Sequence, residues 1–249
     1  MTDRTQVSIL GIPIDDVTYD EALARIAKFV SNGRPHQVVT VNPEFIMTAQ
    51  DDLDFRQILR HTHLNLPDGQ GLIWAAQLLG APLRERVTGV DTVVRLAELS
   101  SQEGYSIFLL GAADGVAAAA AQQLQNRFPE LRIAGTYVGS PAPEEEDQIV
   151  ARIQDVDPDL LFVAYGAPRQ EKWIARNLAR LSVGVAIGVG GTFDFISGEA
   201  SRAPAWVQRL GMEWLHRLAH QPWRWRRMLA LPRFGLLVLR QRFRQETLR

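Results

Sequence analysis

The sequence of 249 residues contains no cysteine. This absence excludes a disulfide scaffold, thiolate zinc sites, iron–sulfur clusters and a cysteine nucleophile. Long apolar runs are also missing: no stretch reaches the ~18 uninterrupted apolar residues that span a bilayer, and the best candidate, Leu229–Leu239, is interrupted by Pro232 and Arg233. The start of the chain, Met1–Gln6, is polar and gives no secretory signal. We therefore expect a protein that is soluble or peripheral on a membrane.

Nucleotide-binding and metal-binding motifs are scarce. The glycine-rich stretch Gly184–Gly191 lacks the third glycine of the dinucleotide fingerprint, because Phe193 stands three residues after Gly190, and no Walker-type Gly-Lys-Ser/Thr occurs. The stretch still allows a close approach of backbone to a ligand. Asp-x-Asp pairs that match the metal motif of many sugar transferases are Asp52/Asp54 and Asp157/Asp159. Their contexts, a surface helix and a turn before a strand, favour structural roles, so we predict no metal and no cofactor.

Acidic residues are nearly absent from the end of the chain. Residues 202–249 hold 11 arginines, no lysine and two acids, a net charge of +9, whereas residues 1–201 carry a net charge of −10. Four of the six tryptophans also lie in the last 48 residues. A basic, tryptophan-rich tail on an acidic body points to phosphates, anionic lipid or nucleic acid, and arginine pairs bidentately with phosphate. The alternative is an ordinary solvated face.

The rest of the pattern is that of a packed α/β protein. Hydrophobic residues make up 46% of the chain and charged residues 22%, which predicts a core rather than disorder. Short apolar runs alternate with helix-like segments, as in βαβ units with a mainly parallel sheet. The predicted strands are Val7–Leu10, Gln37–Val41, Leu64–Leu66, Ser106–Leu110, Arg132–Val138, Leu160–Ala164 and Val183–Val189. Thr18–Glu21 resembles a capping box, and Asp114 is expected to cap an alanine-rich helix that runs to Arg127.

The pattern changes after Arg202, and we place a domain boundary near residue 204. Residues 1–203 form the predicted α/β core, and residues 204–249 form a helical appendage rich in arginine and tryptophan. Helical segments of the appendage are predicted over 205–219, Trp223–Leu231 and Arg233–Gln245, with breaks at Pro222 and Pro232.

Polar residues stand where predicted strands end, and parallel α/β sheets bind ligands outside the carboxyl ends of their strands. Thr40 and Asn42 end the second strand with both side chains on one side, although Asn42 could simply cap the helix that Pro43 begins. Asp68 follows the third strand in a Pro-Asp-Gly sequence, either as a turn residue or as a general base. Gln170 falls in the first turn of a later helix, near the same edge or on a solvated helix start.

Taken in order, a series of short segments resembles one known family. The segments are Thr40–Glu44, Leu66–Gly71, Arg86–Asp91, Phe108–Gly111, Gly166–Trp173, Gly188–Asp194, Arg202–Pro204, Glu213–Leu218 and Pro222–Arg227. Together they resemble the WecG/TagA/CpsF glycosyltransferases, bacterial enzymes that build cell-envelope glycans, from about Val7 to Arg227. The resemblance implies a Rossmann-like, mainly parallel sheet with helices on both faces, followed by a basic helical C-terminal appendage.

The resemblance also implies a reaction. Members of the family transfer a sugar, typically N-acetylmannosamine or its uronic acid, from a UDP-sugar to a sugar linked to polyprenyl diphosphate, with inversion and without a metal. The catalytic role falls on Asp68, and substrate binding falls on Thr40, Asn42, Gln170, Gly188, Gly190, Gly191, Asp194, Arg217, Arg224 and Arg227. The appendage is expected to close over the active site at an anionic membrane surface. This implies a cytoplasmic protein, peripheral on the inner face of the cell membrane, in polysaccharide or teichoic acid synthesis.

Two other functions stay open from the residues alone. A basic-tailed nucleotide- or nucleic-acid-binding module would need a basic surface on the body, whereas residues 1–201 are net acidic, so we predict no nucleic-acid partner. A peripheral membrane scaffold with a degenerate site is disfavoured by the presence of Asp68, Asn42 and the appendage arginines. The exact sugar, the acceptor and a homo-oligomeric state are not fixed by the sequence.

Overall fold

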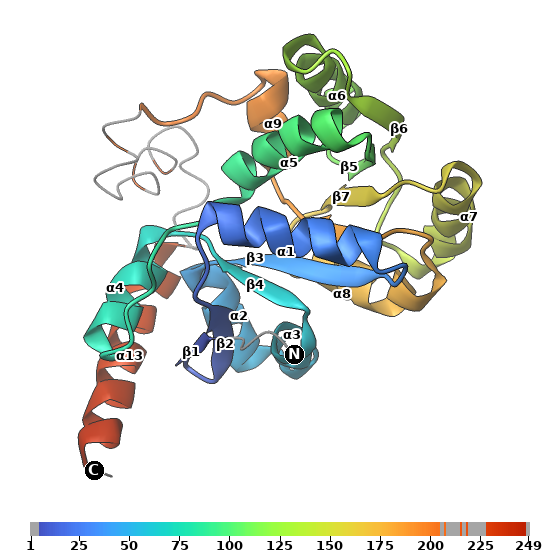
Figure 1. The fold of residues 1–249 in the computed structure, drawn as a ribbon. Helices are drawn as coiled ribbons and strands as arrows, with labels where there is room; N and C mark the ends of the chain where they lie inside the picture. Colours follow the sequence, from blue (N-terminus) through green and yellow to red (C-terminus); the bar gives the residue numbers. More distant parts are fainter. Residues whose placement is uncertain (1–4, 205–206, 208–214, 216–217, 219–227, 248–249) are drawn as a thin grey trace.

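Six parallel strands form the central sheet of the molecule (Figure 1). A computed structural model describes residues 5–204, 207, 215, 218 and 228–247. The strands stand in the order β4-β3-β8-β7-β5-β6, and each pairing is parallel. Their bounds are β3 His36–Val41, β4 Leu64–Pro67, β5 Ser106–Gly111, β6 Arg132–Tyr137, β7 Leu160–Ala164 and β8 Val185–Gly188. The predicted mainly parallel α/β sheet is confirmed.

Helices cover both faces of the sheet, as predicted (Figure 1). One face carries α1 (Tyr19–Ser31), α5 (Gly89–Glu103), α6 (Val116–Arg127) and α9 (Thr192–Ser197). The other carries α2 (Pro43–Asp51), α3 (Leu53–His61), α4 (Gln70–Leu78), α7 (Glu146–Val156) and α8 (Arg169–Asn177). Because successive strand residues point to opposite faces, Val38 packs in the first layer and Val39 in the second. Short 3₁₀ turns lie at Pro143–Glu145 and Leu178–Arg180.

The first predicted strand belongs to a separate hairpin. β1 (Gln6–Ile9) pairs antiparallel with β2 (Ile12–Asp15), a strand that the sequence analysis missed. Leu10 and Gly11 between them have φ of 50° and 80°, the left-handed conformation that a tight hairpin turn needs. The buried carboxylate of Asp15 accepts the backbone N–H of Asn65 at 2.7 Å and so attaches the hairpin to β4.

One predicted helix cap is confirmed and another is wrong. Thr18 and Glu21 form the capping box at the start of α1, with each side chain bonded to the other residue's backbone N–H. Asp114 does not cap α6, because that helix begins at Val116 after Gly115, which has a φ of +77° and supplies no side-chain bond.

The C-terminal helix α13 (Ala230–Thr247) runs through Pro232, where we predicted a break. Pro232 lies in the first turn, where proline is tolerated because that N–H has no partner within the helix. Phe234 and Val238 are buried in the cluster that contains α2 and α4. The Gln241 side chain bonds to backbone of the β1–β2 hairpin region, at 2.8 and 2.9 Å.

The remaining appendage predictions fall largely outside the described residues. Most of the helix predicted over 205–219 and most of that over Trp223–Leu231 lie there, and the boundary near residue 204 stays a prediction. Among the described residues, no helix combines the length and the apolarity that a bilayer span requires.

Candidate active site

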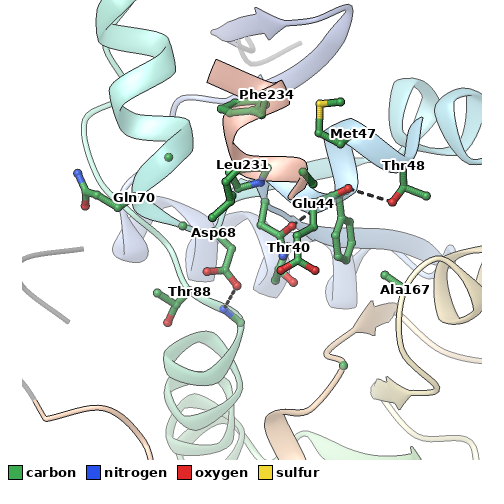
Figure 2. A pocket seen from close by; sticks show the side chains of 18 of the residues that line it. Thr40, Glu44, Met47, Thr48, Asp68, Gln70, Thr88, Ala167, Leu231 and Phe234 are labelled. Atoms are coloured by element: carbon green, nitrogen blue, oxygen red, sulfur yellow. Dashed lines mark hydrogen bonds between the residues drawn. The ribbon is translucent and has the colours of Figure 1, made fainter. Parts of the chain in front are cut away.

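A cavity of about 960 Å³ opens at the carboxyl ends of β3, β4, β7 and β8. Its described lining comes from the loops after these strands, from the start of α5, and from α2, α4 and α13 (Figure 2). This is the edge at which parallel α/β sheets bind ligands. Six of the predicted site residues line it: Thr40, Asn42, Asp68, Gln170, Gly190 and Gly191. Two others, Gly188 and Asp194, lie outside its lining.

Asp68 directs its carboxylate to the cavity from the end of β4. Its Oδ2 accepts the backbone N–H of Gly89 at 3.0 Å, at the start of α5 (Figure 2). The amino end of a helix favours a negative charge. A Cβ placed on Gly89 would lie 3.4 Å from Thr40 Oγ1 and 3.5 Å from Asp68 Oδ2, so the three residues converge. The carboxylate is thus held in position while it faces the cavity, as a general base requires.

Thr40 and Asn42 both contribute to local structure. The Asn42 side chain accepts the backbone N–H of Phe45 at 3.0 Å and caps α2, whose first residue is Pro43. The capping alternative is therefore confirmed. The Thr40 hydroxyl is buried and donates to the carbonyl of Gly188 at 3.4 Å. Substrate-binding roles for both residues stay predictions.

Gln170 joins two of the loops that line the cavity. Its side chain is 1% exposed, and its Oε1 accepts the backbone N–H of Gly166 at 2.9 Å and that of Gly190 at 3.1 Å. Gly166 follows β7 and Gly190 follows β8. Its Nε2 donates to Glu171 Oε1 at 2.6 Å. Gln170 therefore fixes the relative position of these loops, a role that the sequence analysis did not foresee.

Glu171 is a fully buried carboxyl group behind this connection. Its Oε2 has no hydrogen-bond partner among the described residues. Burial raises the pKa of Glu171 to about 7. A Cβ on Gly188 would lie 2.5 Å from Glu171 Oε1 and 2.7 Å from Gln170 Nε2, so β8 requires glycine here. Gly188 therefore packs against Gln170 and Glu171 and does not itself line the cavity.

A second polar network surrounds the start of α5. Arg202 forms a bidentate ion pair with Asp91, at 2.6 and 2.8 Å, and Asp91 Oδ2 accepts the Thr88 hydroxyl at 2.7 Å. Burial alone would raise the pKa of Asp91, but hydrogen bonds from Arg202 and Thr88 outweigh it and lower the pKa to about 2. The network holds Arg202, two residues before the predicted start of the appendage, against the helix that positions Asp68.

The cavity has a polar part around Asp68 and an apolar lining, and Glu44, Thr48, Asp51 and Arg233 add polar groups on the α2 and α13 side. Asp68, Thr40 and Thr88 belong to the polar part, and Leu231 and Phe234 of α13 belong to the apolar part, with Leu231 the nearer of the two to Asp68 (Figure 2). The apolar lining is shared by α2, α4 and α13: Met47, Trp74, Leu78, Leu231, Phe234 and Val238. We call this part the apolar arm. It combines with the polar part to suit a ligand that is itself part polar and part hydrocarbon.

Some lining residues had no assigned role in the sequence analysis. Glu44, Arg86 and Arg202 line the cavity. Each belongs to a segment that carries the family resemblance, and this membership could have identified them from the sequence. The predicted arginines Arg217, Arg224 and Arg227 lie outside the described residues.

The Asp-x-Asp pairs have structural contacts. Asp52 caps α3 and forms an ion pair with Lys172 at 2.7 Å. Asp159 accepts the backbone N–H and the hydroxyl of Ser106 at 2.7 and 2.9 Å. Within the described part of the chain, no three side chains of His, Asp or Glu gather as a metal site would require.

Comparison with known proteins agrees with the geometry. The sequence model of the glycosyl transferase WecG/TagA/CpsF family matches residues 7–248. The chain belongs to this family. The family resemblance drawn from the sequence is confirmed, and so is the prediction of a glycosyltransferase.

Named relatives of this WecG/TagA/CpsF protein share one enzymatic title. A Bacillus subtilis protein is 35% identical over 210 residues, which is 84% of this chain and 81% of the relative. A Bacillus spizizenii protein is 36% identical over 203 residues, 82% and 78% of the two chains. A Staphylococcus aureus protein is 29% identical over 235 residues, 94% and 92%. Each is named N-acetylglucosaminyldiphosphoundecaprenol N-acetyl-beta-D-mannosaminyltransferase.

Proposed function

We propose that this WecG/TagA/CpsF enzyme transfers an N-acetylmannosamine-type sugar from a UDP-sugar to a sugar carried on polyprenyl diphosphate. The observation that carries the proposal is the Asp68 carboxylate, held by the Gly89 N–H at 3.0 Å in a cavity at the strand ends. The names of the relatives support the transferred sugar and the acceptor. The product would serve the synthesis of a cell-envelope polymer.

The reaction is an in-line displacement at the anomeric carbon, with inversion. The acceptor hydroxyl oxygen forms the new glycosidic bond while the bond from the anomeric carbon to the diphosphate oxygen breaks. Asp68 takes the proton of the hydroxyl as general base, and UDP leaves with its electron pair. Thr40 and Asn42 flank Asp68 in the cavity and would position the acceptor.

Negative charge grows on UDP as it leaves. We assign its stabilisation to Arg217, Arg224 and Arg227, together with the backbone N–H of Gly191. The guanidinium groups would offset the negative charge that a metal ion offsets in other transferases, so the proposed reaction needs no metal. The basic appendage would bring the enzyme to the anionic inner face of the cell membrane, where a polyprenyl acceptor resides.

The test is Asp68→Asn, assayed in excess EDTA with UDP-N-acetylmannosamine and a short-chain polyprenyl-diphosphate N-acetylglucosamine. Asparagine keeps an oxygen for the Gly89 N–H, so the fold and UDP binding should persist while transfer falls by ~10²–10⁴. Asp54→Asn, an exposed change of the same kind on α3, should transfer at the wild-type rate. Near-normal turnover by folded Asp68→Asn would remove Asp68 from the base role, and activity that EDTA abolishes would refute metal independence.

A further inference from the structure

The apolar arm of the cavity extends away from Asp68 between α4 and α13. α4 and α13 lie side by side (Figure 1), and the arm follows both helices, from Leu231 to Val238 along α13 and to Leu78 along α4. Arg242 on α13 reaches the end of α4, where its Nη1 lies 3.3 Å from a Cβ placed on Gly80. The two helices therefore run alongside each other away from Asp68, and the arm leads out between them.

One residue of α13 that lines the cavity is an exposed glycine. Gly235 lies inside α13 and lines the cavity, and a Cβ placed on it would meet no described atom within 4 Å. Glycine inside a helix costs about 1 kcal/mol relative to alanine. Neither a positive φ nor a close contact with the described protein explains the residue here. The exposed space beside it in the cavity is open to a ligand.

The arm opens onto apolar surface. Trp74 and Leu78 on α4 line the arm and are 54% and 41% exposed. Large apolar side chains that gather on one surface mark contact with another apolar phase or molecule. A ligand in the arm would thus have its polar end at Asp68 and its hydrocarbon end near this surface.

We propose that the apolar arm binds the first isoprene units of the acceptor's polyprenyl chain, between α4 and α13. This inference rests on the proposed function, since it takes the acceptor to be a lipid-linked sugar. The sugar and diphosphate then lie at the polar part, and the chain leaves past Trp74 towards the membrane. The enzyme then binds the lipid as well as the sugar of the acceptor, so the hydrocarbon next to the diphosphate contributes to acceptor binding.

Gly235→Leu tests the proposal, because Gly235 lines the cavity, a Cβ there meets no described atom within 4 Å, and the larger side chain takes up space in the arm. Transfer is measured with two acceptors that differ only in the lipid: one with a polyprenyl chain of several isoprene units and one with a methyl group on the diphosphate. Gly235→Leu should raise the KM for the polyprenyl acceptor about tenfold or more, a loss of ~1.4 kcal/mol. Its kinetics with the methyl acceptor should match those of the wild type.

Gln77→Leu is the matched control. Gln77 is an exposed residue of α4 outside the cavity lining, so the variant adds the same apolar side chain to the surface without filling the arm. Its kinetics should match the wild type with both acceptors. If Gly235→Leu slows both acceptors equally, or neither, the chain does not lie in the arm.

A binding experiment separates this inference from the proposed transfer reaction. A polyprenyl diphosphate with a photoreactive group on its first isoprene unit should cross-link to peptides of α4 and α13, and Gly235→Leu should suppress the cross-link. Cross-links confined to other segments would overturn the inference. Wild-type enzyme that cross-links in the arm but transfers no sugar to either acceptor would instead contradict the proposed function.

Discussion

The carboxyl group of Glu171 is fully buried, and its protonation should make the protein's stability depend on pH. Burial raises its pKa from 4.5 to about 7, so the folded state holds the proton more tightly than the unfolded state. Stability from this group is fully present below pH 4.5 and is lost as the pH rises to 7. Glu171→Gln keeps an oxygen for Gln170 and cannot ionise. Its free energy of unfolding should therefore fall less than that of the wild type between pH 5 and 8, by up to about 3 kcal/mol.

Urea unfolding at both pH values measures this difference. Glu130→Gln, which alters an exposed carboxyl group, should leave the wild-type pH dependence in place. Identical slopes for Glu171→Gln and the wild type would mean that Glu171 is not the group that titrates.

Single residues were predictable where the strand pattern alone places them. Asp68 and Thr40 end neighbouring parallel strands, and that topology brings their side chains to one edge. The N–H that holds Asp68 was not predictable, because Gly89 is 21 residues away and meets it only in the folded chain. Gln170 was placed near the cleft, but its bonds to two loops depend on β7 and β8 being neighbours.

At the scale of elements, the packing of α8 against β8 should be sensitive to one methyl group. In Gly188→Ala the new Cβ would come within 2.7 Å of both Gln170 and Glu171. Overpacking of this kind typically costs about 1–3 kcal/mol. Gly235→Ala on α13 meets open space and should instead stabilise the protein slightly, by up to about 1 kcal/mol. Chemical unfolding of both variants decides this, and equal stability of Gly188→Ala and the wild type would contradict the close contact.

The sequence prediction was wrong for two elements, the strand β2 and the start of α13. β2 was missed because Ile12–Asp15 is four residues long and contains a proline. Pro232 was read as a break, although the helix begins two residues earlier and so places proline in its tolerant first turn. Five of the six sheet strands are fully buried and could be recognised without their partners, whereas the edge strand β6 is partly exposed.

At the scale of the whole molecule, α13 faces both the body and the surrounding medium. Phe234 and Val238 are 5% and 2% exposed against α2 and α4, whereas Leu236 and Phe243 are more than half exposed. Arg240 and Arg244, which belong to the basic end of the chain, lie on the same helix. A helix with exposed leucine and phenylalanine beside arginine suits the interface of an anionic membrane.

Membrane binding should therefore depend on the exposed side of α13 and not on its buried side. Replacing Leu236 and Phe243 together by serine should leave the melting temperature near the wild-type value, because both side chains are exposed. Binding to vesicles that contain phosphatidylglycerol should weaken, since apolar area no longer enters the interface. The residual binding should fall further with added salt, because each arginine near an anionic surface contributes about 1 kcal/mol through screened electrostatics. Leu53→Ser on α3, at a side chain that is 70% exposed, should bind vesicles as the wild type does. If the double variant binds as tightly as Leu53→Ser, the exposed side of α13 is not the membrane contact, and the apolar arm would have to open towards the bilayer through the exposed residues of α4 alone.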